Sequence, residues 1–292
     1  MEGIVPILKP PAMSSSDAVV DVRKLYDTKR VGHLGTLDPE AAGVLPVCVG
    51  RAVRLFDYLV DKHKEYVAEI AFGIATDSQD AQGEVIRRSD QIVMRTELEA
   101  VLPHFLGDIE QVAPMYSALK YNGKKLYDLA RAGVQIPEKR RPVRIDRLEL
   151  GEQTGENRFL LTIGCTRGTY IRTLCADIGD AIGVPAHMAF LLRTASGDFT
   201  LDHSYTIAEL KEHKEHGTLG QTLISCEEAL RFLPMHALAA DRKKPTLNGL
   251  ETTVRGAQDG TVRLYADGTF LGIGVIENGS ARLTVNLYSE TI

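Results

Sequence analysis

The sequence contains no long hydrophobic run and few cysteines. None of its 292 residues lies in an apolar stretch approaching the roughly 18 residues of a membrane-spanning helix. Residues 1–9 carry one acidic and one basic side chain and no long apolar segment, so we expect no signal peptide. The four cysteines lie far apart without a Cys-x-x-Cys pair, which argues against a disulfide scaffold and a zinc ribbon and fits a reducing compartment. We therefore expect a soluble, cytoplasmic protein with no membrane partner.

Positive charge is scarce in the chain as a whole. With 34 basic and 39 acidic residues the formal net charge is −5, which argues mildly against a nucleic-acid partner. Residues 115–147 reverse this balance, because basic side chains there outnumber acidic ones by nine to three. A solvated helix face could produce the same run, but a local patch steers a polyanion regardless of the net charge. Its basic residues include Lys120, Lys124, Arg140 and Arg141.

Several common catalytic motifs are absent from the sequence. It has no phosphate-binding Gly-x-x-x-x-Gly-Lys-Ser/Thr loop, no Gly-x-Ser-x-Gly elbow and no His-Glu-x-x-His. His213 and His216 have a spacing that could suit a metal, but they lie at the highly charged end of a predicted helix. We therefore expect no metal site.

The hydrophobic pattern alternates between strands and amphipathic helices, with no internal repeat. Period-two alternation and short β-branched runs predict strands at residues 3–8, 44–49, 66–72, 143–150, 158–165 and 186–199. Helical spacing and a Ser-x-x-Asp capping signal predict helices at residues 14–26, 51–60, 96–105, 125–132, 169–182 and 206–232. After Pro234, short strands are separated by Asp259-Gly260, Asp267-Gly268 and Asn278-Gly279, which are typical hairpin turns.

These elements predict an α/β (α+β) fold. We expect a central mixed, mostly antiparallel sheet with flanking helices, followed by a small C-terminal β-rich module. The expected boundaries are residues 1–232 for the larger domain and 233–292 for the module. An active cleft should cross the middle of the sheet.

Two segments carry candidate functional residues. The turn between residues 32 and 43 holds His33 and Asp38 among glycines that allow a tight turn and close approach to a ligand. A turn that only connects two secondary-structure elements would have the same residues. Tyr170 and Arg172 open a helix, where aligned N–H groups favour an anion, although Arg172 could be only a surface charge near a cap.

Residues 32–46, Gly-His-Leu-Gly-Thr-Leu-Asp-Pro-Glu-Ala-Ala-Gly-Val-Leu-Pro, resemble the signature of the bacterial tRNA pseudouridine-55 synthase family (the TruB type). The resemblance holds in order and spacing from residue 3 to about residue 200. It continues through Lys9-Pro10, Lys64-Glu65-Tyr66 with Thr76-Asp77-Ser78, Pro114 to Lys120, Arg167 to Leu174, and His187 to Arg193.

The resemblance implies an isomerase that acts without a cofactor or metal. Such an enzyme breaks the N-glycosidic bond of uridine 55 in the T loop of tRNA, rotates the base and rejoins it through carbon. Asp38 corresponds to the essential aspartate, which either attacks the sugar or removes the 2′ proton. Both roles require an ionised carboxylate, and burial alone would raise its pKa. Arg172 corresponds to the arginine that pairs with this aspartate.

The resemblance also implies the parts that hold the RNA. The target base must be flipped out, with Tyr66 stacking on it and Tyr170 and Leu191 lining the same pocket. His33 fills the space that the flipped nucleotides leave. The basic run corresponds to an inserted thumb, at about residues 113–142, that closes over the T arm, and the C-terminal module resembles a PUA-type domain that touches the acceptor stem. We expect a monomer with no obligate protein partner.

Four positions depart from the family pattern, and none carries a catalytic role: Leu8, Ala12, Ser16 and Leu192. An RNA-binding or RNA-folding module is the alternative function, but it would not need Asp38, Tyr66 and Arg172 together. A relative that works on guide-RNA-selected sites is disfavoured, because such proteins carry long basic tails that this sequence lacks.

Overall fold

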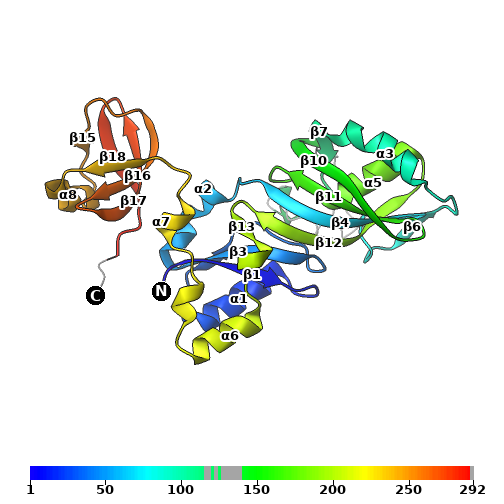
Figure 1. Cartoon of the computed structure of the whole chain (residues 1–292), viewed down its shortest axis with the longest axis horizontal. Helices are drawn as coiled ribbons and strands as arrows, with labels where there is room; N and C mark the ends of the chain where they lie inside the picture. The colour runs from blue at the N-terminus through cyan, green and yellow to red at the C-terminus, as the bar shows by residue number, and fades with distance from the viewer. Residues whose placement is uncertain (115–119, 122–123, 126–139, 290–292) are drawn as a thin grey trace.

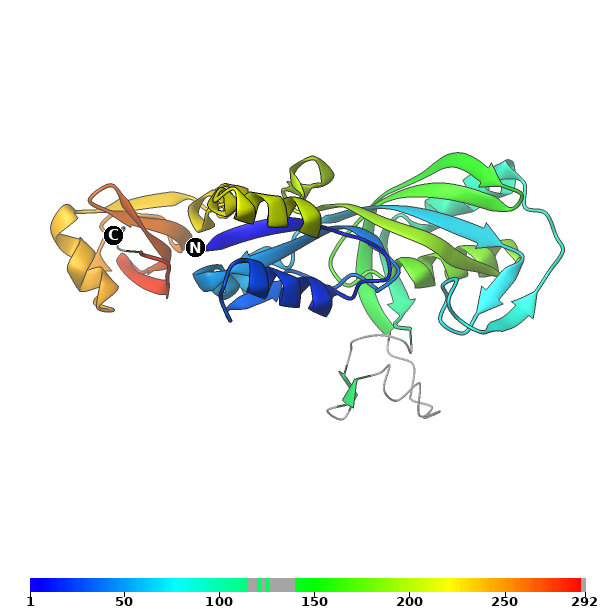
Figure 2. The same ribbon diagram turned by 90° about the horizontal axis from the view of Figure 1, so that it is seen from below.

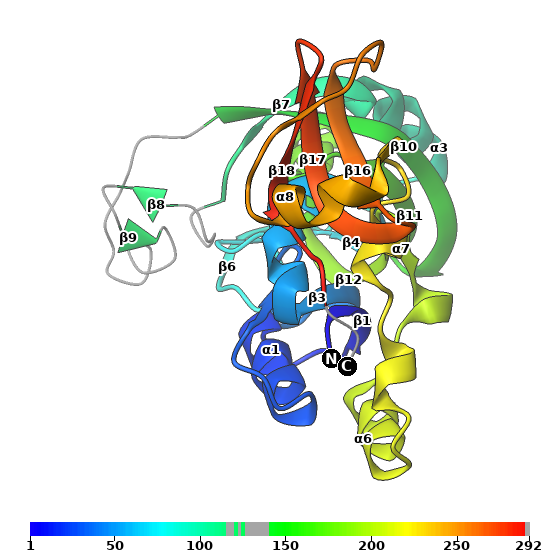
Figure 3. The ribbon, with the colours of Figure 1, turned by 90° about the vertical axis from the view of Figure 1, so that its left-hand side faces the viewer.

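The computed structural model describes residues 1–289 except 115–119, 122–123 and 126–139. The helix predicted at residues 125–132 therefore lies almost entirely outside the described residues. Within the basic insertion, β8 (Lys120–Tyr121) pairs with β9 (Lys124–Lys125). This two-stranded hairpin lies apart from the main sheet (Figures 2 and 3).

A nine-stranded sheet forms the centre of the molecule (Figure 1). All of its pairings are antiparallel except the one between β12 and β3, so the prediction of a mixed, mostly antiparallel sheet is confirmed. Its main path runs through β1 (Gly3–Lys9), β3 (Ala42–Val49), β12 (Ala186–Ser196), β4 (Lys64–Phe72), β11 (Arg158–Cys165), β10 (Arg140–Gly155) and β7 (Gly107–Val112). Two short strands complete it: β2 (Val31–His33) beside β3, and β13 (Phe199–Thr200) beside β12.

Helices cover the sheet at both of its ends. α1 (Ser15–Leu25) begins with the predicted capping box between Ser14 and Asp17, and it contacts α6 (Ile207–Glu215). α5 (Ile171–Ile182) packs against β12 and β4, and α3 (Arg95–Val101) contacts α5 (Figures 1 and 2). Within the described residues no helix is long and apolar enough to cross a membrane. All four cysteines are buried free thiols.

Several predicted elements are shorter than expected because glycines interrupt them. The long helix predicted at residues 206–232 is wrong: α6 stops before Gly217 (φ +69°), and η4 (Leu219–Thr222) and α7 (Cys226–Ala229) follow separately. The strand predicted at residues 186–199 turns at Gly197 (φ +60°) into the β12–β13 hairpin. Two other predicted helices consist partly of 3₁₀ turns, with η1 (Gly50–Leu55) before α2 (Phe56–Leu59) and η2 (Leu102–Phe105) after α3. Strands β2, β7, β5 (Ile74–Thr76) and β6 (Val85–Arg88) were not predicted.

The C-terminal residues form the predicted β-rich part, a five-stranded sheet with one short helix, α8 (Lys243–Leu247). Asp267-Gly268 and Asn278-Gly279 make the expected hairpins, whereas Asp259-Gly260 makes none because β15 pairs with β18. The strand order is β14 (Met235–Leu238), β16 (Gly260–Ala266), β17 (Thr269–Glu277), β18 (Ser280–Asn286) and β15 (Thr252–Thr253).

The C-terminal sheet shares a hydrophobic cluster with the central sheet. Ile273 and Leu287 are buried together with Ile4 and Leu230. The guanidinium groups of Arg51 and Arg54 donate to backbone carbonyls near the end of β18, at Tyr288 and Asn286. The two sheets are therefore packed together rather than linked by a free segment.

Candidate active site

The predicted turn between β2 and β3 is held in place by buried polar side chains. The Lys9 ammonium donates to the carbonyl oxygens of Pro10, Met13 and Pro39 at 2.7–2.9 Å. The Ser15 hydroxyl donates to the Leu37 carbonyl and accepts from the Leu37 N–H, both at 2.9 Å. Contacts on both sides of residue 38 therefore fix the backbone of the turn.

The turn presents the carboxylate of Asp38 to Arg172. The Nε atom of Arg172 lies 2.9 Å from Oδ2 of Asp38, and its NH2 group donates to Oδ1 at 3.4 Å. The Arg172 side chain is 6% exposed on the first turn of α5, whereas the Asp38 side chain is 41% exposed. A ligand can thus reach the carboxylate while the guanidinium stays buried behind it.

A second carboxylate, which the sequence prediction missed, holds the same arginine. The NH1 group of Arg172 donates to Asp80 Oδ2 at 3.4 Å and to the Ser78 carbonyl at 3.3 Å. Asp80 is itself fixed, because its Oδ1 accepts from the Ser78 hydroxyl at 2.6 Å and from the Gln82 N–H at 3.1 Å. Its turn lies between β5 (Ile74–Thr76) and β6 (Val85–Arg88), and Asp80 lies two residues after the Thr76-Asp77-Ser78 motif.

Opposing charges surround Asp38. Burial raises the pKa of Asp38 above its usual range, and Asp80 adds to this effect, whereas Arg172 and Lys9 act in the opposite direction. Burial also lowers the pKa of Lys9 to about 8. The cations beside Asp38 therefore favour the ionised carboxylate against the cost of burial.

Tyr66 and Leu191 lie on adjacent strands near this carboxylate. Tyr66 on β4 is directly opposite Arg193 on β12, and Leu191 is opposite Ala68. Side chains two residues apart on a strand share a face, so Leu191 lies diagonally beside Tyr66. Both are buried in the core cluster that also contains Leu37 from the turn. Burial raises the pKa of the Tyr66 hydroxyl, and the charge of the facing Arg193 opposes this rise.

Tyr170 is the N-cap of α5, and another residue that the sequence prediction missed fixes its backbone. The side-chain amide of the fully buried Gln111 on β7 accepts from the Tyr170 N–H at 2.9 Å and donates to its carbonyl at 3.2 Å. The guanidinium carbon of Arg141 lies 5.9 Å from the centre of the Tyr170 ring. The end of the basic insertion, where β10 begins, therefore lies beside the start of the helix that carries Arg172.

His33 is the last residue of β2 and comes just before the turn that carries Asp38. Its buried Nδ1 atom has no hydrogen-bond partner among the described residues. Burial, with the nearby Arg193, lowers the pKa of His33, so the ring is neutral at neutral pH. Of the predicted RNA contacts, Arg140 and Arg141 begin β10, whereas the side chains of Lys120 and Lys124 lie outside the described residues.

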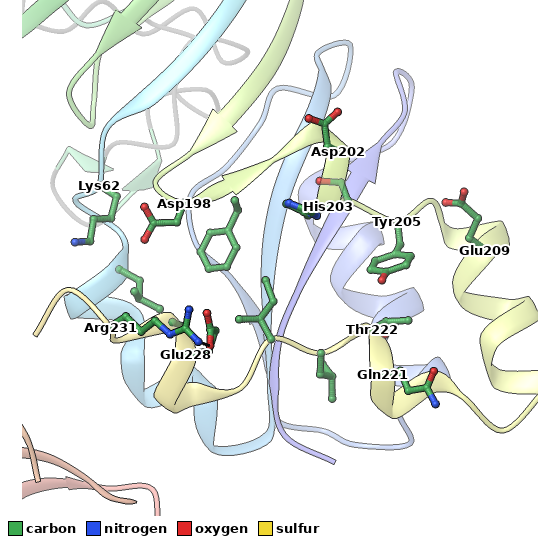
Figure 4. A pocket seen from close by; sticks show the side chains of 16 residues that line it. Lys62, Asp198, Asp202, His203, Tyr205, Glu209, Gln221, Thr222, Glu228 and Arg231 are labelled. Atoms are coloured by element: carbon green, nitrogen blue, oxygen red, sulfur yellow. Dashed lines mark ion pairs between the residues drawn. The ribbon is translucent and has the colours of Figure 1, made fainter. Parts of the chain in front are cut away.

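A separate hollow of about 730 Å³ lies between β13, with the turn that follows it, and the segment that runs through α6, η4 and α7 (Figure 4). Acidic and basic side chains both line it, among them Asp198, Asp202, Glu228 and Arg231. The residues that line it in the described part of the chain include none of the predicted site residues. The candidate site is therefore the surface around Asp38.

Solved structures share this fold over almost the whole chain. The chain titled "Crystal Structure of a Cbf5-Nop10-Gar1 Complex" is 26% identical with a TM-score of 0.70, and the alignment covers 94% of this chain and 78% of that one. The central sheet and the carboxylate–arginine pair above it thus define a protein with the pseudouridine synthase fold.

Sequence comparison gives the particular family. The pattern for "TruB family pseudouridylate synthase (N terminal domain)" matches residues 23–171, and that for "tRNA pseudouridylate synthase B C-terminal domain" matches residues 172–231. The protein named tRNA pseudouridine synthase B from Bacillus pumilus is 45% identical over 240 residues, 80% of this chain and 78% of that protein. Its namesake from Alkaliphilus oremlandii is 41% identical over 285 residues, 95% of this chain and 94% of that protein. The chain belongs to the TruB family of pseudouridylate synthases.

Proposed function

We propose that the protein isomerises uridine to pseudouridine at position 55 in the T loop of tRNA. The observation that carries this proposal is the partly exposed Asp38 carboxylate, paired at 2.9 Å with the buried guanidinium of Arg172. Family membership supplies the reaction and the tRNA substrate. The site supplies what that reaction needs, a reachable carboxylate beside a cation that favours its charged form.

Asp38 acts on the sugar of the flipped nucleotide. The bond between N1 and C1′ breaks, and a bond between C5 and C1′ replaces it. The base loses its C5 proton and gains one at N1, so the product is an isomer of the substrate. Asp38 either attacks C1′ or removes the 2′ proton, and both routes need the ionised carboxylate that Arg172 and Lys9 favour.

Four side chains receive the RNA around this carboxylate: Tyr66, Leu191, Tyr170 and His33. The ring of Tyr66 stacks on the flipped base, and Leu191 and Tyr170 line the same pocket. His33 fills the space that the flipped nucleotides leave, and its neutral ring suits that role. The support for this arrangement is the shared sheet face of Tyr66 and Leu191 and the fixed backbone of Tyr170.

The rest of the chain holds the body of the tRNA. Residues 1–232 form the catalytic domain, and its basic insertion at about 113–142, with Lys120, Lys124, Arg140 and Arg141, contacts the T arm as a thumb. Residues 233–292 form a PUA-like module that contacts the acceptor stem. The enzyme acts in the cytoplasm as a monomer, without an obligate protein partner, a cofactor or a metal.

Tritium release from unmodified tRNA transcript labelled at C5 of uridine tests the proposal. Wild-type protein is expected to release tritium, and Asp38→Asn is expected to bind the transcript without release. A transcript that lacks uridine 55 is the substrate control, and release from it would overturn the assigned position. If the wild type binds tRNA tightly but releases no tritium, the proposed enzymatic function is wrong and an RNA-folding role is favoured.

A further inference from the structure

Arg193 is the largest fully buried side chain in the described part of the molecule, at 1% exposure. It lies on β12 between two strands that both belong to the candidate site. In the register of the sheet it is opposite Tyr66 on β4 and beside Gly43 on β3. A Cβ atom on Gly43 would lie 2.1 Å from the Arg193 carbonyl oxygen, so only glycine allows the two backbones to approach this closely.

The guanidinium of Arg193 reaches both halves of the site. It donates to the carbonyl oxygens of Val44 at 2.7 Å and of Thr36 and Gly35 at 3.3 Å. It also faces Tyr66, which lies directly opposite in the sheet, and it lowers the pKa of the Tyr66 hydroxyl against the effect of burial. One side chain therefore ties the turn that carries Asp38 to the ring that is expected to receive the base.

Hydrophobic packing does not account for an arginine at this position. A guanidinium remains charged in a protein, and an unpaired buried charge costs far more than an apolar side chain of similar volume. No carboxylate among the described residues forms an ion pair with Arg193; it donates to carbonyl oxygens and faces the phenol of Tyr66. These groups lie on the segment that carries Asp38 and on β4, which carries Tyr66. The reaction depends on the relative position of these two elements.

We propose that Arg193 is a positioning residue that fixes the Tyr66 ring and the Gly35–Asp38 turn in one frame, so that stacking places the sugar of the flipped nucleotide against the Asp38 carboxylate. This inference rests on the proposed function. Arg193 touches neither base nor sugar and acts through Tyr66 and the turn. A displacement of about 1 Å between groups that must meet the same substrate lowers a rate by up to about 100-fold.

The test compares Arg193→Lys with the wild type at saturating tRNA. Lysine keeps the positive charge but cannot reach three carbonyls and face the Tyr66 hydroxyl at once, so we expect a rate at least about 10-fold lower, with a dissociation constant for tRNA within about threefold. Arg193→Gln is the second variant, which removes the charge. Arg95→Lys is the matched control, because Arg95 on α3 also donates to backbone carbonyls, at Leu150 and Gly151, and is assigned no role in the site or in RNA binding. It should keep the wild-type rate.

Two further measurements separate positioning from general stability. Tyr66→Phe removes the hydroxyl that interacts with Arg193, so its effect and that of Arg193→Lys should be less than multiplicative in the double variant. In protein labelled with 3-fluorotyrosine, the ¹⁹F resonance that disappears in Tyr66→Phe should shift or broaden in Arg193→Lys. An unchanged resonance, a wild-type rate or fully multiplicative effects would overturn the inference. The ¹⁹F measurement needs no activity, so an inactive wild type would refute the proposed function without deciding the role of Arg193.

Discussion

Replacing Arg172 with lysine tests the chemical core of the site. In the wild type, the guanidinium makes two contacts with Asp38 and donates to both Asp80 and the Ser78 carbonyl. A lysine ammonium keeps the charge but is a single point on a flexible stem, so it cannot hold both carboxylates in this geometry. Losing one hydrogen bond to a charged group costs about 1.5–3 kcal/mol, and each 1.36 kcal/mol corresponds to about tenfold in rate. We therefore expect single-turnover isomerisation to slow by about 10- to 150-fold.

The pH dependence of the same variant gives a second readout. The ionised form of Asp38 is the active one, so the rate falls as the pH drops through the pKa of Asp38. Burial raises this pKa and Arg172 lowers it, so a less well-placed cation lets it rise further. The acid limb of the rate profile should therefore move to higher pH in Arg172→Lys.

The assay is tritium release under single-turnover conditions, with tRNA binding measured in parallel. Arg167→Lys is the matched control, because Arg167 pairs with Asp61 through side chains that are 50% and 70% exposed. Exposed ion pairs contribute at most about 1 kcal/mol, so this variant should behave as the wild type. A rate for Arg172→Lys within threefold of the wild type, or an acid limb that does not move, would refute the role assigned to the pair.

Three other outcomes are expected. Tyr66→Phe should retain more isomerisation than Tyr66→Ala because an aromatic ring still stacks on the base, and equal losses would instead make the hydroxyl a proton carrier. Arg140→Glu with Arg141→Glu should reduce the slope of log Kd for tRNA against log salt concentration by the amount expected for about two phosphate contacts. An unchanged slope would show that neither residue lies in the interface. Burial and Asp180 raise the pKa of Asp177 to about 6, so stability should fall as pH rises between about 4 and 6. Asp177→Asn should then raise Tm at pH 7.5 but not at pH 3, and an equal change at both values would contradict this origin.

Local pattern was sufficient to predict most strands and the first helix. The alternation in β4 and β11 matches strands whose buried positions follow period two, and the capping box at Ser14 begins α1 as predicted. The predicted helix at residues 206–232 was wrong because glycine-containing turns interrupt it. Backbone N–H and C=O groups in this segment form hydrogen bonds with residues distant in sequence, whereas α5 is a continuous helix. Ile224, for example, exchanges backbone hydrogen bonds with Ile4. Such long-range pairing has no local signature.

Local sequence likewise predicts only some of the residues of the candidate site. A motif can indicate Asp38, Arg172 and Tyr66, but it does not show what holds them. Arginine and glutamine are mostly exposed in proteins, so nothing local indicates that Arg193 and Gln111 are buried under the site. Their burial follows from where β12 and β7 lie in the sheet, which depends on the complete strand order. Asp80 had a local signal, since it lies two residues after the Thr76-Asp77-Ser78 motif.

The shared cluster around Ile4 has a consequence for synthesis on the ribosome. β1 is synthesised long before Leu230, Ile273 and Leu287, yet Ile4 at its start is buried with these three residues. Domains generally fold as units while the N-terminal part emerges first. Here β1 stays only partly covered until Leu287 has left the exit tunnel. The nascent chain must therefore keep this edge of the sheet from aggregating until the C-terminal sheet has formed.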